Sequence, residues 1–259
     1  MSIWIGLPYM ERRWTFSPAR SLSADRWQKP ADALEVAFPT DDGVQLVGWF
    51  LAGAIPRNGV SVLALSGSLG VLPESVPQAQ FLQSLGFNVL LFDFRGFGKS
   101  EGTSLSEATL NVDGAAALRY LTKERGVDPQ SIALIGSSLG AAVAANLATS
   151  YPCRAVALIG AFGSAKTQGK RIKPWMPDFV FDLLSSPLDT TAKIDRANCP
   201  VLIVHGADDA IPLEEAEAIF DAAPLPKRLI VIPDAEHAMS DSIVRDFLDD
   251  VASFFINRR

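Results

Sequence analysis

The chain has 259 residues, of which 48% are hydrophobic, so it can bury the core of one large domain or of two small ones. Its 23 basic residues are outnumbered by 29 acidic ones, and the resulting net charge of -6 argues against a surface that tracks nucleic-acid phosphates. We therefore expect a single domain over residues 1–259, with small molecules rather than nucleic acid as partners.

The beginning of the chain and the two cysteines indicate where the protein works. The first ten residues, MSIWIGLPYM, are followed rather than preceded by arginines and lack a cleavage site, unlike a signal peptide. No segment reaches the roughly 18 to 20 apolar residues of a membrane-spanning helix, although the aromatic start allows a peripheral membrane contact. Cys153 and Cys199 lie beside apolar runs and are expected to be reduced core thiols. We expect a cytoplasmic protein.

Eight apolar runs rich in Val, Ile and Leu predict β-strands. In chain order they are LEVAF, QLVGWFLA, VSVLALS, NVLLFD, SIALIG, RAVALIG, PVLIVHG and RLIVIPD. From residue 60 onward the runs are continuous rather than alternating, which is typical of strands buried on both faces of a parallel sheet. Helical patterns cover residues 76–85, 107–125, 139–149, 214–222 and 241–256. This order predicts the α/β class, with a mostly parallel sheet of about eight strands and helices on both faces.

A segment from residue 161 to residue 198 interrupts the alternation of strands and helices. It contains KRIKPWMPDFVFDLLSSP, in which the prolines exclude one long helix. We expect a short lid or irregular insertion within the domain. Trp175, Phe179 and Phe181 in this segment either line a substrate pocket or pack the segment onto the sheet. In such sheets ligands bind beyond the carboxyl ends of the strands, so functional residues are expected just after each strand.

The stretch LIGSSLGAAVAAN contains a G-x-S-x-G pattern directly after a predicted strand and at the start of a predicted helix. The spacing of Gly136 and Gly140 selects Ser138 rather than Ser137 as the central serine. Glycines on both sides let a strand and a helix close around a strained turn, and the free N–H groups of a helix N-terminus favour developing negative charge. The pattern predicts a nucleophile elbow with Ser138 at its tip.

A serine hydroxyl needs a base to take its proton, and histidine is the usual one. Of the two histidines, His205 ends a predicted strand, where we expect a buried ring bonded to the backbone. His237 follows the last predicted strand in the loop DAEHAMS, where the base belongs in the chain order serine, acid, histidine. The acid lies in HGADDAIP, and the residues alone leave Asp208 and Asp209 as candidates.

The segment FDFRGFGKSEG is similar to the end of a phosphate-binding loop without completing it. That motif requires glycine at the position of Asp93, whose carboxylate would repel phosphate. No helix follows at once to provide an anion site. Nucleotide binding is therefore not expected.

Taken together and in this order along the chain, these motifs resemble those of the α/β-hydrolase fold serine hydrolases. Within that family they are similar to the small-lid branch, which includes serine aminopeptidase-like and palmitoyl-protein thioesterase-like enzymes. The resemblance runs from about residue 12 to the C-terminus. It rests on VAFPTDDGVQLVGWFLAG, the D-x-R-G-x-G-x-S turn from Asp93 to Ser100, the elbow, PVLIVHGADD and IPDAEHA. It implies an α/β-hydrolase fold with a catalytic triad and with no metal or organic cofactor.

The resemblance makes Ser138 the nucleophile and His237 the general base and then acid. The family usually places its acid four residues after the histidine of a His-Gly pair, which is Asp209, whereas counting back from the proline gives Asp208. We take Asp209 as the acid.

The oxyanion hole is implied to consist of the backbone N–H groups of Leu139 and Ser68, each typically worth about 3 to 4 kcal/mol of transition-state stabilisation. The chain departs from the family at Ser66, where a histidine usually precedes the glycine, and at Ser137, where a histidine or an aromatic residue is frequent. Because the expected donor in this loop is a backbone N–H group, the presence of Ser66 in place of histidine does not remove it.

The expected function is cleavage of carboxylic esters or thioesters through an acyl-enzyme, since these need less leaving-group help than amides. One alternative is an aminopeptidase-like amidase or peptidase, which needs an acidic anchor for a substrate amine. The other is a catalytically silent α/β-hydrolase-fold ligand-binding protein.

Overall fold

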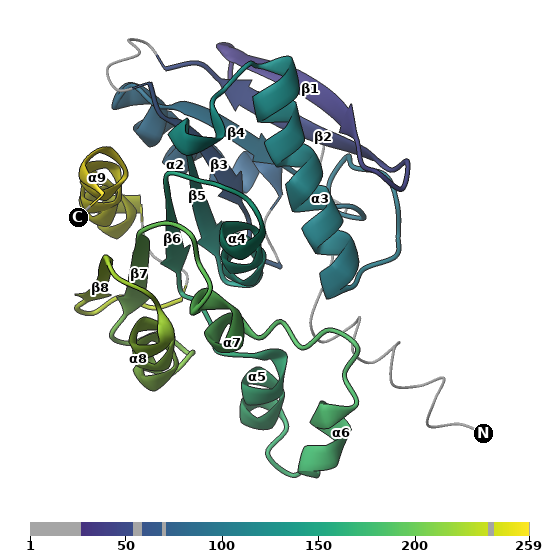
Figure 1. Cartoon of the computed structure of the whole chain (residues 1–259), viewed down its shortest axis with the longest axis vertical. Coiled ribbons are helices and arrows are strands. Elements are labelled where there is room, and N and C mark those ends of the chain that lie inside the picture. The colour runs from purple at the N-terminus through teal and green to yellow at the C-terminus, as the bar shows by residue number, and fades with distance from the viewer. Residues whose placement is uncertain (1–26, 54–58, 69–70, 238–240, 259) are drawn as a thin grey trace.

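We describe the protein from a computed structural model, for residues 27–53, 59–68, 71–237 and 241–258 (Figure 1). The aromatic N-terminal stretch considered above for a membrane contact lies outside these residues. Eight strands form one sheet in the order β1-β2-β4-β3-β5-β6-β7-β8. The strands are β1 (Ala33–Pro39), β2 (Gln45–Leu51), β3 (Ser61–Leu65), β4 (Asn88–Phe92), β5 (Ile132–Ser137), β6 (Ala155–Ile159), β7 (Val201–Gly206) and β8 (Lys227–Ile232). Each of the eight apolar runs overlaps one of them.

Strand β2 is antiparallel to both of its neighbours, and every pairing from β4 across to β8 is parallel. This confirms the predicted fold class. Successive side chains of a central strand enter opposite layers of the core: Leu134 of β5 joins one hydrophobic cluster, and Ala133 and Ile135 join the other. The continuous apolar runs therefore reflect burial on both faces of the sheet.

Helices cover both faces, as predicted. The helices α3 (Glu107–Arg119), α4 (Leu139–Ser150), α7 (Thr190–Ile194) and α8 (Leu213–Ala222) contribute to one core cluster, and α2 (Leu72–Ser84) and α9 (Asp241–Asn257) contribute to the other. Helix α2 begins before the predicted start at residue 76. Pro73 fits the first turn of a helix, where its missing N–H costs nothing.

The segment between β6 and β7 forms short helices instead of one long one. Helices α5 (Ala165–Ile172) and α6 (Asp178–Asp182) stand away from the sheet at one end of the molecule, and α7 returns to it (Figure 1). The Ser164 hydroxyl accepts a hydrogen bond from the Thr167 amide and so caps α5. Pro174 follows the end of α5 and Pro177 precedes α6, as expected for prolines that interrupt a helix.

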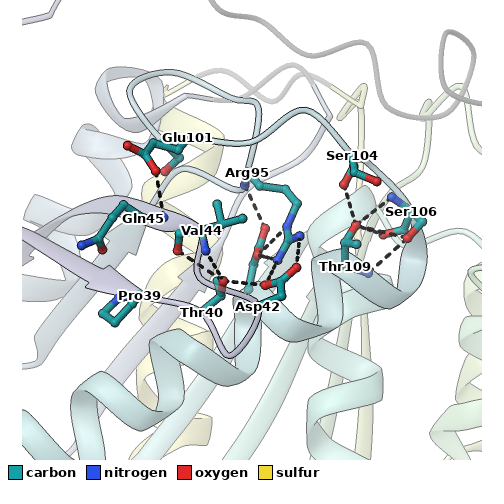
Figure 2. Close-up of polar contacts among 12 residues, drawn as sticks. Pro39, Thr40, Asp42, Val44, Gln45, Arg95, Glu101, Ser104, Ser106 and Thr109 are labelled. Atoms are coloured by element: carbon teal, nitrogen blue, oxygen red, sulfur yellow. Dashed lines mark hydrogen bonds and ion pairs between the residues drawn. The ribbon is translucent and has the colours of Figure 1, made fainter.

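A buried arginine, Arg95, joins the hairpin loop between β1 and β2 to α3. Figure 2 shows its contact with Asp42 of that loop. The Arg95 guanidinium makes two hydrogen bonds with the Asp42 carboxylate, at 2.6 and 2.9 Å, and its Nε atom lies 2.8 Å from Asp113. The Arg95 amide also donates to Asp113. In this chain the D-x-R-G turn therefore carries a structural ion-pair network.

Asp93, at the start of the same turn, is fully buried. Its carboxylate accepts hydrogen bonds from the amides of Leu72, at 2.9 Å, and Lys99, at 3.3 Å. Gly98 approaches so closely that a Cβ there would collide with this carboxylate. The start of α2, just after the loop that follows β3, is thereby fixed to the turn after β4.

Cys153 and Cys199 are buried just before β6 and β7, with their Sγ atoms 2.9 Å apart as free thiols. Within the described part of the chain, no helix has the length and apolar character needed to cross a bilayer.

Candidate active site

Ser138 occupies a strained turn between β5 and α4, with φ 50° and ψ -114°. Its amide donates to the carbonyl of Ile159 in the neighbouring strand, at 2.9 Å. A Cβ on Gly136 would collide with the backbone of Gly140, and a Cβ on Gly140 would collide with the Leu65 carbonyl. Both glycines of the G-x-S-x-G pattern are thus required by the close approach of strand and helix. This turn presents Ser138 at the carboxyl end of the central strand β5.

His237 and Asp209 meet at the same side of the sheet, where the parallel strands have their carboxyl ends. Asp209 follows β7 and His237 follows β8, and the His237 Nδ1 atom lies 3.0 Å from both Asp209 carboxylate oxygens. At Gly160, which directly follows β6 and has φ 51°, a Cβ would lie 3.2 Å from the His237 ring and 3.3 Å from Asp209 Oδ2. Asp208 is exposed, and its amide donates to the Ala235 carbonyl. The structure therefore brings Asp209 rather than Asp208 to the histidine.

The Asp209 side chain is buried, whereas that of His237 is 39% exposed. Burial by itself raises the pKa of Asp209, but hydrogen bonds from His237 and from the Ile211 amide, the latter at 2.7 Å, outweigh it. The pKa of Asp209 is consequently lowered below its ordinary value. An ionised carboxylate at this place selects the His237 tautomer with a proton on Nδ1, which leaves Nε2 as a proton acceptor.

His205 has the structural place expected from its sequence context. Its ring is fully buried, and Nε2 lies 2.8 Å from the carbonyl oxygen of Ile211. Within the described residues, its Nδ1 atom has no hydrogen-bond partner. Since the Ile211 amide donates to Asp209, His205 supports the loop that carries this carboxylate.

Ser138 and His237 share a pocket of about 200 Å³ with Ser68. The rest of its lining is mostly apolar and comes from the segment after β6 and from the loop after β7. These residues are Phe162, Ala165, Gln168, Gly169, Arg171, Ile172, Phe181, Leu184, Ala210 and Ile211. The arrangement offers a hydroxyl, an imidazole and an apolar wall to one bound molecule.

Of the three aromatic residues considered for this pocket, Phe181 lines it and is buried. Trp175 and Phe179 are 74% and 64% exposed and do not line it, so neither expectation for these two was correct. Phe181 packs against Gly169 of α5. Residues two apart on a helix point in roughly opposite directions, and Phe179 therefore faces away when Phe181 faces inward.

The residues expected to supply the oxyanion donors, Leu139 and Ser68, follow Ser138 in the chain and line the same pocket as Ser138, respectively. Leu139 is the first residue of α4, and Ser68 lies in the turn after β3, next to residues 69 and 70, which are outside the described chain. A Cβ on Gly67 would lie 3.4 Å from the Ser138 Cβ. The β3 loop is thus in contact with the elbow.

Sequence reasoning did not identify Gln168, Arg171 or Glu215 as site residues, because no motif contains them. Gln168 and Arg171 line the pocket, and the Glu215 carboxylate in α8 accepts hydrogen bonds from Gly163 and Thr167 at the start of α5. The described residues contain no group of three or more His, Cys, Asp or Glu side chains that could hold a metal ion.

Comparisons with known proteins identify the family and the fold of the chain. The family model described as "Serine aminopeptidase, S33" matches residues 61–187. An uncharacterized protein of Mycobacterium tuberculosis is 37% identical over 204 residues, which cover 78% of this chain and 72% of that relative.

Two solved structures share the fold at low sequence identity. The esterase Pf2001 of Pyrococcus furiosus aligns with a TM-score of 0.74 and 21% identity over 94% of this chain and 97% of its own. An alpha-beta hydrolase of Vibrio vulnificus aligns with a TM-score of 0.79 and 19% identity over 98% and 94%. The elbow on a mostly parallel sheet, the family match and these likenesses lead to one conclusion: the chain belongs to the α/β-hydrolase fold serine hydrolases.

Proposed function

We propose that the protein hydrolyses carboxylic esters or thioesters through a covalent acyl-enzyme on Ser138. The observation that carries the proposal is the apolar pocket that Ser138 shares with His237, whose ring is held by the buried carboxylate of Asp209. The substrate is accordingly a small acyl compound, and the chain acts as a hydrolase.

In the first half-reaction the Ser138 Oγ atom attacks the substrate carbonyl carbon while His237 Nε2 takes the hydroxyl proton. The carbonyl oxygen becomes an oxyanion that the amides of Leu139 and Ser68 stabilise. The bond from the carbonyl carbon to the alcohol or thiol then breaks, and His237 gives the proton to the leaving group. In the second half-reaction water repeats these steps and releases the acid and free Ser138.

In this proposal Asp209 orients His237 and stabilises its protonated ring, because its carboxylate faces Nδ1 and ionises readily. Asp208 has no part in the reaction. Residues 161–198 act as a short lid of a single hydrolase domain, since α5 and α6 provide one wall of the pocket.

The pocket lining favours an esterase over an aminopeptidase. Anchoring the amine of a peptide substrate requires a carboxylate, and the described residues that line this pocket include no Asp or Glu. An apolar wall suits the acyl chain of an ester or thioester instead.

The test is a series of p-nitrophenyl esters from acetate to long-chain acids, with initial rates measured for the wild type, Ser138→Ala and Ser137→Ala. We expect the wild type and Ser137→Ala to hydrolyse some members, Ser138→Ala to fall to the enzyme-free rate, and a fluorophosphonate probe to label only proteins that retain Ser138. Wild-type protein that neither hydrolyses any ester nor reacts with the probe would instead indicate a silent ligand-binding protein.

A further inference from the structure

Helix α5 carries several basic residues, and two of them are neutralised by acidic residues of α6. Lys166 forms an ion pair with Asp182, and Lys170 forms one with Asp178 at 2.6 Å. Arg171 differs from both. It lines the pocket of Ser138 and His237, and within the described part of the chain no ion pair with a carboxylate is found for it.

The Arg171 guanidinium is nevertheless held in place. Its Nε and Nη2 atoms donate to the Gln168 Oε1 atom, at 3.2 and 2.8 Å. The same amide uses Nε2 to contact the Glu215 carboxylate at 3.4 Å. A side chain in α8 thus contacts Gln168, and Gln168 in turn binds the Arg171 guanidinium.

Glu215 also anchors the helix that carries this arginine. Its Oε2 atom accepts hydrogen bonds from the Gly163 amide, at 2.6 Å, and from the Thr167 hydroxyl, at 2.9 Å. The first turn of α5 is therefore tied to α8, and the guanidinium is presented from a supported helix. A guanidinium has five N–H donors, so the contacts with Gln168 leave its Nη1 atom for a ligand.

We propose that Arg171 forms an anion-binding subsite and that the enzyme prefers esters whose acyl chain ends in a carboxylate. This inference rests on the proposed esterase function. The apolar lining residues Ala165, Ile172 and Phe181 suit the methylene chain, and the guanidinium matches the geometry of a terminal carboxylate. Arg171 is an exposed residue, so an anion can reach its guanidinium from solvent.

The experiment compares kcat/KM for mono-p-nitrophenyl adipate and p-nitrophenyl hexanoate, which have acyl chains of equal length that differ in the terminal carboxylate. The proteins are the wild type, Arg171→Gln and Lys170→Gln. The last variant removes a charge from the same helix at a residue that does not line the pocket. Rates are corrected for enzyme-free hydrolysis.

We expect the wild type to prefer the adipate ester and Arg171→Gln to lose about tenfold or more on that ester alone, because a charge-assisted hydrogen bond is lost. Lys170→Gln should keep the preference. Equal wild-type rates on both esters, or an equal loss on both in Arg171→Gln, would overturn the subsite while leaving the esterase proposal intact.

A third substrate, 4-(hexanoyloxy)benzoate, places the carboxylate on the leaving group. Dependence on Arg171 for this ester instead of the adipate would overturn the assignment to the acyl side. Absence of wild-type turnover on all three esters would overturn the subsite, and the proposed function fails with it only if the whole p-nitrophenyl ester series and the fluorophosphonate probe also give no reaction.

Discussion

The His237 Nδ1 atom lies 3.0 Å from both carboxylate oxygens of Asp209, although the two residues are 28 positions apart in the sequence. They meet because β7 and β8 are neighbouring parallel strands, so the loops after them leave the sheet at the same edge. The Ile211 amide also donates a hydrogen bond to the Asp209 carboxylate, at its Oδ1 atom. The ring is therefore oriented by a carboxylate that is itself fixed by the backbone.

Replacing this carboxylate is expected to abolish most of the esterase activity. In Asp209→Asn the amide no longer stabilises a protonated His237 or selects its tautomer, and kcat should fall by about four orders of magnitude. Asp208→Asn is the matched control, because its side chain is exposed and does not reach the ring, and its kcat should remain close to that of the wild type. A large loss in Asp208→Asn with a small loss in Asp209→Asn would reverse the assignment of the acid.

The sheet could be predicted from the sequence because burial on both faces leaves an unbroken apolar run, as in IALIGS of β5. Ser138 and His237 could be chosen as candidates because the chemistry demands those residue types directly after strands. The choice between Asp208 and Asp209 depended on a family spacing, since adjacent loop residues point in different directions and only the folded loop shows which one faces the ring.

Helices α5 and α6 could not be predicted, because tertiary contacts hold them. Glu215, which binds Gly163 and Thr167 at the start of α5, lies about fifty residues further along the chain. The error on Trp175 and Phe179 has the same origin. Aromatic residues in a segment suggest burial, but the direction of each side chain depends on how a short helix is held.

Substitution of Gly140 tests whether the turn at Ser138 leaves no room for a side chain between α4 and the end of β3. Gly140→Ala places a Cβ against the Leu65 carbonyl, a backbone atom that cannot move aside, and should destabilise the fold by about 3 kcal/mol or more. Gly114→Ala in α3 is the control. Its Cβ meets the flexible end of Leu147, and the gain in helix propensity of about 1 kcal/mol opposes the contact. The free energy of unfolding in urea is measured for both variants. Equal values would contradict the steric requirement for glycine at position 140.

The buried guanidinium of Arg95 should contribute more to stability than its partly exposed partner Asp42, whose side chain is 48% exposed. Arg95→Met leaves the buried Asp113 carboxylate without its guanidinium and should cost about 3 to 5 kcal/mol. Asp42→Asn removes a charge near solvent and should cost about 1 kcal/mol or less. The free energy of unfolding in urea measures both. Similar losses would show that the network depends equally on its exposed side.

Asp93 is expected to make stability depend on pH. Burial raises its pKa from 3.8 to about 7, against the lowering effect of hydrogen bonds from the Leu72 and Lys99 amides. The folded state therefore holds the proton more tightly than the unfolded state does. The corresponding stabilisation is fully present below about pH 4 and is lost as the pH rises to about 7 and beyond.

The variant Asp93→Asn isolates this effect, because its amide oxygen can still accept the Leu72 hydrogen bond while carrying no charge. Between about pH 5 and about pH 8 the wild type should lose more unfolding free energy than the variant, by on the order of a few kcal/mol. All other titrating groups are common to both proteins, so the difference between their urea-unfolding profiles reports Asp93 alone. Parallel profiles would mean that the carboxyl group is ionised in the folded protein throughout this range, with the two backbone amides outweighing its burial.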